Sequence, residues 1–215
     1  MIYTAPPQSL LKHLKGPLNR KLTYKNRLTN LPDPSGALVF YSALKKENIK
    51  KISSNHYQFV SNEFGSLFVS ISDDGDGRAP KGEVTLIASI FTKTKDWFDL
   101  DKQNYLKRKK DFMKKISLEL ESQFDILPEN WLHRELATPL GFEKWTNRPN
   151  GIVGGLGQNT DIFGLFGLSS RTPFQGLWLC WDSIYPGEGT AGVSQSALMV
   201  SRQILASKGN NNLNL

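Results

Sequence analysis

The chain has 215 residues and a mass of 24.2 kDa, a size that allows one large domain or two small ones. Because 39% of the residues are hydrophobic and 11% are aromatic, the chain can bury a substantial core, which argues against wholesale disorder. No apolar run approaches the roughly 20 residues that span a bilayer, and the N-terminus lacks a signal-peptide layout. The single cysteine, Cys180, excludes an internal disulfide and a cysteine-bound metal cluster, so no metal is expected, and a reducing cytoplasm fits.

The formal net charge of +7 is unevenly distributed along the chain. No acidic residue precedes Asp33, whereas basic residues recur from Lys12 to Arg27, and a second basic run, "KRKKDFMKK", covers residues 107–115. Such charge suits an anionic partner: nucleic acid, a membrane surface or phosphates. The second run lies in a helical pattern, which favours a solvated helix face. Neither run is accompanied by a zinc spacing or an RNA-binding signature, so nucleic acid is not expected as a partner.

The first half of the chain predicts a short strand, a short helix and then a sheet. "MIYTA" is typical of a strand that ends at Pro6-Pro7, and residues 8–14 favour a helix that ends at Gly16-Pro17. Four apolar segments follow at hairpin-like intervals: "ALVFYSAL", "HYQFV", "SLFVSIS" and "EVTLIASIF". This spacing predicts a mainly antiparallel sheet.

Two further features of this half are a loop and a helix. The acidic segment "DDGDG" at residues 73–77 resembles a calcium loop, but it lacks the closing glutamate and Arg78 follows at once, so a plain turn is favoured. Residues 101–124 predict a long basic helix that ends before Pro128.

The C-terminal part predicts a strand, a glycine turn and a helix. "LWLCW" at residues 177–181 is a continuous apolar run, as in a central strand covered on both faces. "YPGEGTAG" then supplies a turn before a helix over residues 190–206, whose apolar positions predict a buried face: Val193, Ala197, Val200 and Ile204.

This turn has the layout of half a nucleotide site. The first N–H groups of a helix lack partners within it and carry partial positive charge, and glycines allow a cofactor to approach the backbone. An aspartate at the end of the strand can accept hydrogen bonds from sugar-like hydroxyls. Strand, acid, turn and helix could therefore hold one edge of a nucleotide or flavin, although a structural glycine turn explains the pattern equally well.

A resemblance to a known family adds to this interpretation. "DSIYPGEGTAGVSQSAL" resembles the closing flavin motif of the phytoene desaturase and carotenoid isomerase family of FAD enzymes. Within that family the chain is most similar to the carotenoid 3',4'-desaturases. "LPDPSGALVFY", "SLFVSISDDGDGRAPKGEVTLIASIFT", "TPLGFEKWTNRPNGIVGGLGQ" and "RTPFQGLWL" stand in the expected order, so the resemblance covers essentially the whole chain.

The resemblance implies an α+β fold, in which a mainly antiparallel substrate-domain sheet with helices is joined to a C-terminal strand–turn–helix of a two-domain FAD oxidoreductase. It implies three parts: residues 1–10, a remnant strand of the FAD-binding domain; 11–170, the substrate-binding domain; and 171–215, the C-terminal segment of the FAD-binding domain. FAD is the implied cofactor, and the implied cofactor-binding residues are Asp182, Ser183, Gly187, Gly189, Thr190, Ala191, Gly192 and Val193.

Two departures from the family pattern concern the cofactor. The family opens with a GxGxxG fingerprint and an acidic residue for the ribose, and neither is found in this sequence, so the resemblance implies that the Rossmann half is missing. The residue before Asp182 is normally glycine, and here it is Trp181. We therefore expect the chain alone to hold no tightly bound FAD, and a separate chain is a candidate supplier of the dinucleotide-binding half.

The implied reaction is desaturation of a carotenoid in carotenoid biosynthesis, with the chain inactive alone. Alternatives are a carotenoid cis–trans isomerase of the same family, an inactive remnant or flavin-free binding module, and a basic interaction protein. No catalytic residue can be named, since the three histidines are scattered without evident partners. A cytoplasmic location at the periphery of a membrane is expected, with the basic stretch from Lys12 to Arg27 at the anionic surface. Four aromatic residues are candidates for the substrate-binding wall, with ordinary core as the alternative: Phe142, Trp145, Phe163 and Phe166.

Overall fold

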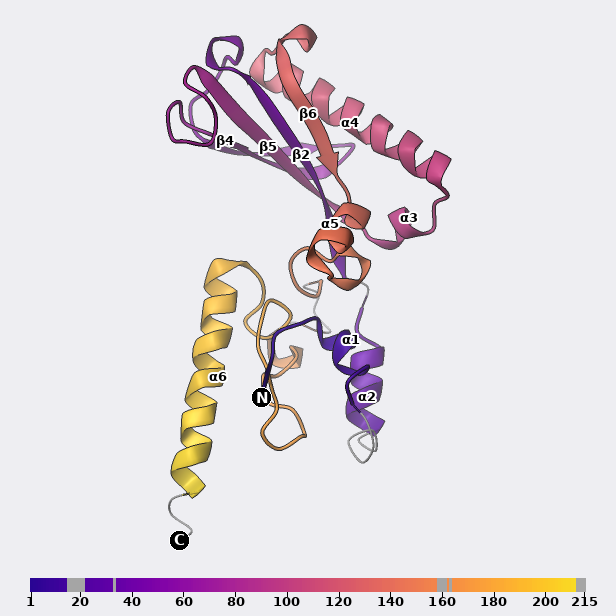
Figure 1. Cartoon of the computed structure of the whole chain (residues 1–215), viewed down its shortest axis with the longest axis vertical. Coiled ribbons are helices and arrows are strands. Elements are labelled where there is room, and N and C mark those ends of the chain that lie inside the picture. Colours follow the sequence, from indigo (N-terminus) through magenta and orange to yellow (C-terminus); the bar gives the residue numbers. More distant parts are fainter. Residues whose placement is uncertain (15–21, 33, 158–161, 163, 212–215) are drawn as a thin grey trace. The chain divides into compact units, whose positions relative to one another are not determined.

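The chain forms two compact units. The computed structural model describes residues 1–14, 22–32, 34–157, 162 and 164–211 (Figure 1). The terminal unit comprises Met1–Ser35 and Ile152–Leu215, and the sheet unit comprises Gly36–Gly151. These boundaries differ from the expected division at residues 10/11 and 170/171. The assignment of a substrate-binding and an FAD-binding role to parts of the chain stays a prediction.

The sheet unit is built on a five-stranded sheet with the strand order β3-β4-β5-β2-β6. The pairs β3–β4, β4–β5 and β2–β6 are antiparallel, which confirms the mainly antiparallel sheet with helices of the expected α+β fold. The strands are β2 (Ser35–Lys45), β3 (His56–Ser61), β4 (Gly65–Ile71), β5 (Glu83–Lys93) and β6 (Trp131–Ala137). The helices are η2 (Lys46–Asn48), α3 (Lys95–Phe98), α4 (Lys102–Phe124), η3 (Pro128–Asn130), α5 (Pro139–Thr146) and η4 (Pro149–Gly151).

Helix α4 covers one face of this sheet (Figure 1). Alternate residues of β5 are buried because successive side chains of a strand point to opposite faces. They pack in one core with Phe40 of β2 and with Ile116, Leu120 and Phe124 of α4. Trp97 of α3 is fully buried in the same core, and the guanidinium of Arg108 lies 5.2 Å from the centre of its ring. The opposite face of the sheet is not part of this core.

Helix α4 begins at a charged cap. The carboxylate of Asp101 accepts hydrogen bonds from the Asn104 N–H at 2.9 Å and from the Asn104 side-chain amide at 2.5 Å. These bonds hold the pKa of Asp101 below its ordinary value of 3.8, with the backbone bond as the largest cause. Because the folded-state pKa is lowered, the stabilisation is present above pH 3.8 and is lost as the pH falls through the folded value.

We expect Asp101→Asn to remove this pH dependence while keeping a cap, since asparagine also accepts a hydrogen bond at this position. The melting temperatures of the unmodified protein and of Asp101→Asn, measured from about pH 6 down to about pH 2, should converge in acid. A temperature difference that is constant over this range would contradict the prediction. Asp101→Ala has no capping side chain, so at neutral pH it should melt at a lower temperature than both the unmodified protein and Asp101→Asn.

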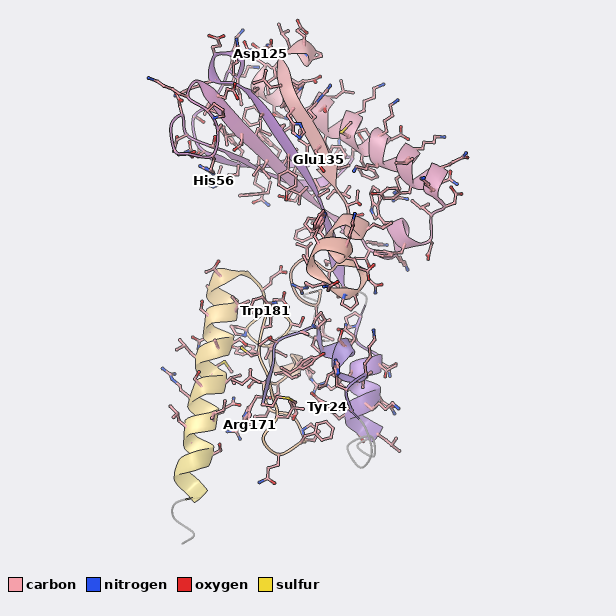
Figure 2. All side chains as sticks on the ribbon, in the orientation of Figure 1. Tyr24, His56, Asp125, Glu135, Arg171 and Trp181 are labelled. Carbon is pink, nitrogen blue, oxygen red and sulfur yellow. The ribbon has the colours of Figure 1, made fainter. Side chains whose placement is uncertain are left out.

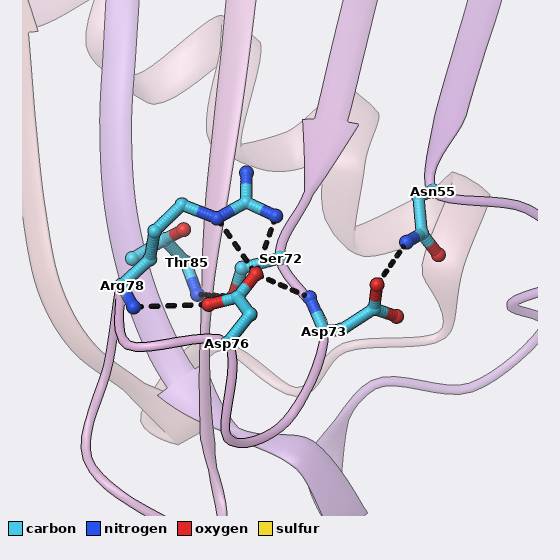
Figure 3. A network of polar contacts seen from close by, with 6 residues as sticks. All are labelled: Asn55, Ser72, Asp73, Asp76, Arg78 and Thr85. Atoms are coloured by element: carbon cyan, nitrogen blue, oxygen red, sulfur yellow. Dashed lines mark hydrogen bonds and ion pairs between the residues drawn. The ribbon is translucent and has the colours of Figure 1, made fainter.

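The acidic loop between β4 and β5 uses its carboxylates to close itself (Figure 3). Asp76 accepts hydrogen bonds from the Asp73 N–H at 3.0 Å and from the Arg78 N–H at 2.9 Å, and it forms an ion pair with the Arg78 guanidinium. The hydrogen bond from the Arg78 side chain, whose Nε–H donates to Asp76 at 2.7 Å, is the main reason why the pKa of Asp76 is lowered. Asp73 accepts from the Asn55 amide at 2.7 Å. In the described part of the chain no cluster of metal-ligating side chains is found, and residues 74–75 form a turn.

The terminal unit pairs the N-terminal strand with a strand of the C-terminal part of the chain. Strand β1 (Ile2–Tyr3) pairs in parallel with β7 (Trp178–Leu179). Around them lie α1 (Pro7–Leu10), α2 (Leu22–Thr29), η5 (Gly164–Phe166) and α6 (Gly189–Asn211). The expectation of a central five-residue strand at 177–181 is wrong for this structure: the strand has two residues and belongs to a two-stranded sheet. The run is apolar because Leu177 and Leu179 pack into the local core with Leu10, Leu28 and Phe174.

The predicted buried face of α6 is only partly correct. Val200 is buried, and Val193 and Ile204 are half-buried, but Ala197 is exposed. Ser196 is instead fully buried: its hydroxyl accepts a hydrogen bond from the Trp181 N–H at 3.1 Å. The Gln203 side-chain amide donates to the Ser170 hydroxyl at 2.8 Å. Polar residues therefore orient this helix, and a pattern of apolar spacing cannot detect them.

Candidate functional site

The segment from Asp182 to Gly189 forms the turn that the sequence analysis singles out. The Asp182 side chain is 7% exposed and accepts a hydrogen bond from the Ser183 hydroxyl at 3.1 Å. Gly187 and Gly189 have φ values of 124° and 83°, in a region that L-residues with side chains rarely adopt. These two glycines therefore let the chain reverse direction directly before α6.

A second glycine segment packs against this turn. The Gly155 N–H donates to the carboxylate of Glu188 at 3.1 Å, and a side-chain carbon on Gly155 would collide with the Asp182 carbonyl oxygen. A side-chain carbon on Gly154 would collide with the Glu188 carboxylate, and Gly154 has a φ of 78°. The adjacent glycines were the available signal for close backbone packing.

The N-terminus of α6 is itself closely packed. A side-chain carbon on Gly192 would meet the Gly187 carbonyl oxygen, so the helix lies directly on its own turn. Thr190 and Ala191 are exposed and Val193 is half-buried. The first turn of α6 contains no acidic residue, so no side-chain carboxylate there offsets the positive end of the helix dipole.

A flavin ring does not fit beside Asp182 in this conformation. The cavity there has a volume of about 20 Å³ and is lined by residues of the turn and by Leu156, Ile162 and Leu168. That volume suits a single water molecule, whereas small-molecule sites have about 300–1,000 Å³. A cofactor-binding role for the eight residues from Asp182 to Val193 stays a prediction that requires the turn to open. We therefore derive no step through FAD.

Trp181 has the backbone geometry of a glycine. Its φ is 138°, which a bulky L-residue adopts only under strain, and its side chain is 44% exposed. The Ser196 hydroxyl, which accepts from the Trp181 N–H, holds this peptide in place. The backbone at this position therefore suits the glycine that the resemblance implies.

The four candidate residues for a substrate wall lie in different parts of the molecule. Phe142 and Trp145 are on α5 of the sheet unit, where Phe142 is half-buried and Trp145 is 81% exposed. Phe166, in η5 of the terminal unit, is 66% exposed and borders a cavity of about 440 Å³. Phe163 lies outside the described residues. Their joint role as a wall stays a prediction.

An apolar surface that sequence analysis missed lies on the face of the sheet opposite to α4. Phe68 pairs in register with Ser89 of β5, so it shares a face with Phe91 two residues further along. Large exposed side chains on this open face are Tyr41, Val60, Phe68 and Phe91, with exposed fractions of 39%, 90%, 45% and 67%. The ring of His56 stacks on Phe68 with a centroid distance of 6.0 Å (Figure 2 labels His56). We call Tyr41, Val60, Phe68 and Phe91 the open-face cluster.

The remaining observations define the class of the chain. No helix in the described ranges combines the length and apolar character needed to cross a membrane. His133 lies 3.9 Å from Glu135 on the exposed edge strand β6, which gives no enclosed acid–base pair. The described residues form a mixed α/β chain with a two-unit organisation, a closely packed glycine turn before a long helix, and an apolar sheet face.

Comparison with known proteins connects this chain to one group of enzymes. No family model matches the sequence. The chain is 30% identical over 149 residues to prolycopene isomerase, chloroplastic, from Daucus carota, which covers 68% of this chain and 24% of that protein. It is 27% identical over 161 residues to the Arabidopsis thaliana enzyme of that name, a match that covers 74% of this chain and 27% of that protein. It is 29% identical over 151 residues to prolycopene isomerase 2 of an Oncidium hybrid cultivar, a match that covers 68% of this chain and 25% of that protein. The chain spans about a quarter of the length of the curated relatives it matches.

These relatives are enzymes, and their names describe isomerisation rather than desaturation. The chain is thus a relative of carotenoid isomerases, and the similarity supports the isomerase alternative better than the desaturase expectation. The relatives are named as chloroplastic, which does not test the expected cytoplasmic, membrane-peripheral location of this chain.

Proposed function

We propose that this chain is part of a carotenoid isomerase of the phytoene desaturase family, and that it contributes to cis–trans isomerisation of prolycopene or a similar polyene. The similarity to prolycopene isomerases over about 70% of the chain carries this proposal. The desaturase expectation has no comparable support. FAD remains the proposed cofactor of the whole enzyme, with a separate chain as one possible source of the dinucleotide-binding half.

The open-face cluster supports a role for this chain in holding the polyene. A carotenoid hydrocarbon offers no group to hydrogen-bond, so its binding depends on apolar contact area and aromatic faces. Tyr41, Phe68 and Phe91 supply such faces from three strands of one sheet, and a rigid sheet presents them without loop ordering. An exposed cluster of this kind is uncommon on a surface without a binding role.

We expect prolycopene to bind the purified full chain and Phe91→Ser to weaken that binding about tenfold. The change removes an aromatic side chain that is 67% exposed, so the fold should tolerate it, while the lost contact area is worth about 1.5–3 kcal/mol when covered. Binding is measured by titrating detergent-solubilised prolycopene and following its absorbance spectrum on the protein.

Leu118→Ser is the matched control. Leu118 is 55% exposed on α4, on the other side of the sheet, and its replacement removes a similar apolar surface. If both variants weaken polyene binding equally, the binding is non-specific and the open-face cluster has no special role. If neither the chain nor its variants bind prolycopene at all, the proposed function itself is contradicted.

Two partners expected from the sequence remain proposals. An anionic membrane surface at the basic segment from Lys12 to Arg27 is tested by sedimentation with anionic and neutral liposomes, and equal binding to both would contradict it. Residues 15–21 of this segment lie outside the described part. A separate dinucleotide-binding chain is tested by adding a Rossmann half from a relative, which should restore flavin binding and isomerisation together.

A further inference from the structure

A hollow of about 460 Å³ lies between α2 and the segment 168–173 of the terminal unit. Its volume falls within the range of small-molecule sites. Leucine and proline side chains form part of its wall, while charged and hydroxyl groups form the rest. The lining residues that matter here are Leu22, Tyr24, Arg27, Leu168, Arg171 and Pro173. Figure 2 labels Tyr24 on α2 and Arg171 on the facing segment.

Two arginines line this hollow, and neither is neutralised by an acid in the described part of the chain. The guanidinium of Arg27 donates to the carbonyl oxygens of Phe166 at 3.0 Å and Gly167 at 3.1 Å, which fix its position without cancelling its charge. Within the described residues, the hydrogen bonds of Arg171 come from its backbone: its N–H donates to the Ser169 hydroxyl, and a β-bridge joins it to Trp178. Two uncompensated guanidinium groups at one hollow favour an anion.

Tyr24 forms a rigid part of the wall of this hollow. Its hydroxyl oxygen is buried and has no hydrogen-bond partner among the described residues, although buried polar groups are nearly always paired. Its ring is held edge-on against Phe174 with a centroid distance of 5.8 Å. Burial raises the pKa of Tyr24 to about 12, so the hydroxyl stays protonated and uncharged. Because the hydroxyl oxygen is covered, Tyr24 contributes its ring to the wall of the hollow and leaves the head group to the arginines.

A second hollow continues from the first. It has a volume of about 440 Å³, shares Arg27 and Leu168 with the first, and is otherwise bordered mainly by apolar side chains: Leu31, Leu156, Ile162 and Phe166. The two hollows therefore place a cationic part and an apolar part side by side along the same wall. This order matches a ligand with a charged head and a hydrocarbon tail.

We propose that this pair of hollows is a binding site for an amphipathic anion, a carboxylate or phosphate carried on a hydrocarbon tail. Arg27 and Arg171 bind the head group, and the tail lies along Leu168 toward Leu31 and Phe166. A small free anion would leave the apolar hollow unfilled, and a neutral polyene would leave both guanidinium groups without a partner. The site is thus separate from the open-face cluster of the sheet unit.

Three probes with the same tail test this proposal: dodecanoate, dodecyl phosphate and dodecanol. Each is titrated into the full chain below its micelle concentration, with binding followed by calorimetry. We expect saturable one-to-one binding of at least one of the two anions, and about tenfold weaker binding of dodecanol, since hydrogen bonds to charged groups supply the difference. Whichever anion binds more tightly identifies the head group. Absence of saturable binding by both anions, or equal binding of dodecanol, overturns the proposal.

Two variants separate a binding role from a structural one. Arg171→Gln should weaken binding of the preferred anion about tenfold, while Arg202→Gln, an equal change of charge at an exposed position of α6 that does not line either hollow, should not. Tyr24→Phe removes a covered hydroxyl and keeps the ring in the wall, so it should leave both the affinity and the fold of the site unchanged. Unchanged affinity in Arg171→Gln, or equal weakening by Arg202→Gln, overturns the proposal.

Discussion

Replacement of Gly155 by alanine is expected to destabilise the terminal unit by about 1–3 kcal/mol, the typical cost of overpacking. A β-carbon at this position would collide with the carbonyl oxygen of Asp182, which is backbone and cannot rotate away. Relief of the collision requires the segment 152–157 to move off the turn. The hydrogen bond from the Gly155 N–H to Glu188 would then be lost as well. The free energy of unfolding is measured by urea denaturation, followed by tryptophan fluorescence.

Gly157→Ala provides the matched control for this change. It is the same substitution two residues away, and the nearest atom to its β-carbon would be the Ser35 hydroxyl oxygen at 4.0 Å. We expect a change below about 0.5 kcal/mol, since surface substitutions without a special contact have small effects. Equal effects of the two substitutions would show that the segment 152–157 does not pack closely against the turn at Asp182.

The sheet could be predicted from the sequence because each of its strands carries its own pattern. In β5 the residues Val84, Leu86, Ala88 and Ile90 alternate with less buried neighbours, and this period of two is visible without any knowledge of the partners. The long helix α4 was predictable for the same reason, with its apolar positions at helical spacing and a capping aspartate directly before it. Local patterns of this kind fix the elements and the face that each one buries.

The orientation of α6 and the length of β7 could not be predicted in this way. The side chain that α6 buries completely is Ser196, whose hydroxyl accepts from a backbone N–H that lies 15 residues earlier in the sequence. Strand β7 has two residues because its partner β1 has two, and that partner lies at the other end of the chain. Both features depend on contacts between segments distant in sequence, which a local pattern does not encode.

The candidate site was predictable in position but not in detail. The glycine turn lies where the sequence places it, directly before a long helix, and Asp182 stands at its start. The contact of Gly155 with the turn and the small volume beside Asp182 emerge only from the fold. The open-face cluster was missed because each of its residues looks like an ordinary strand residue. Their shared exposure depends on α4 covering one face of the sheet only.

Trp181 is the position at which the sequence and the backbone geometry disagree most. Its φ of 138° lies where glycine is favoured and where a residue with a β-carbon is strained, at a cost of about 1–3 kcal/mol. Tryptophan persists there because the surrounding structure holds the peptide: Ser196 accepts from its N–H, and the Trp181 carbonyl accepts from the Ile184 N–H at 3.3 Å. The hydrogen bond to Ser196 of α6 therefore helps to offset the backbone strain at Trp181.

We therefore expect Trp181→Gly to be more stable than Trp181→Ala by about 1 kcal/mol or more. Both variants lose the contacts of the indole, so the comparison isolates the backbone. In regular structure glycine is less stable than alanine by roughly 0.5–1 kcal/mol, because it loses more conformational freedom on folding. The expected order is reversed here, since alanine keeps the strained β-carbon and glycine does not. Urea denaturation of the two variants measures the difference.

The same pair of variants bears on the turn as a cofactor site. If Trp181→Ala is the more stable of the two, the backbone at 181 is not strained and the positive φ does not mark a position suited to glycine. If Trp181→Gly is the more stable, the fold keeps a glycine geometry directly before Asp182 although the sequence supplies tryptophan. The indole, 44% exposed, would then be the group added to an otherwise preserved turn. Its removal would be the first change to make in any attempt to restore flavin binding with a supplied dinucleotide-binding half.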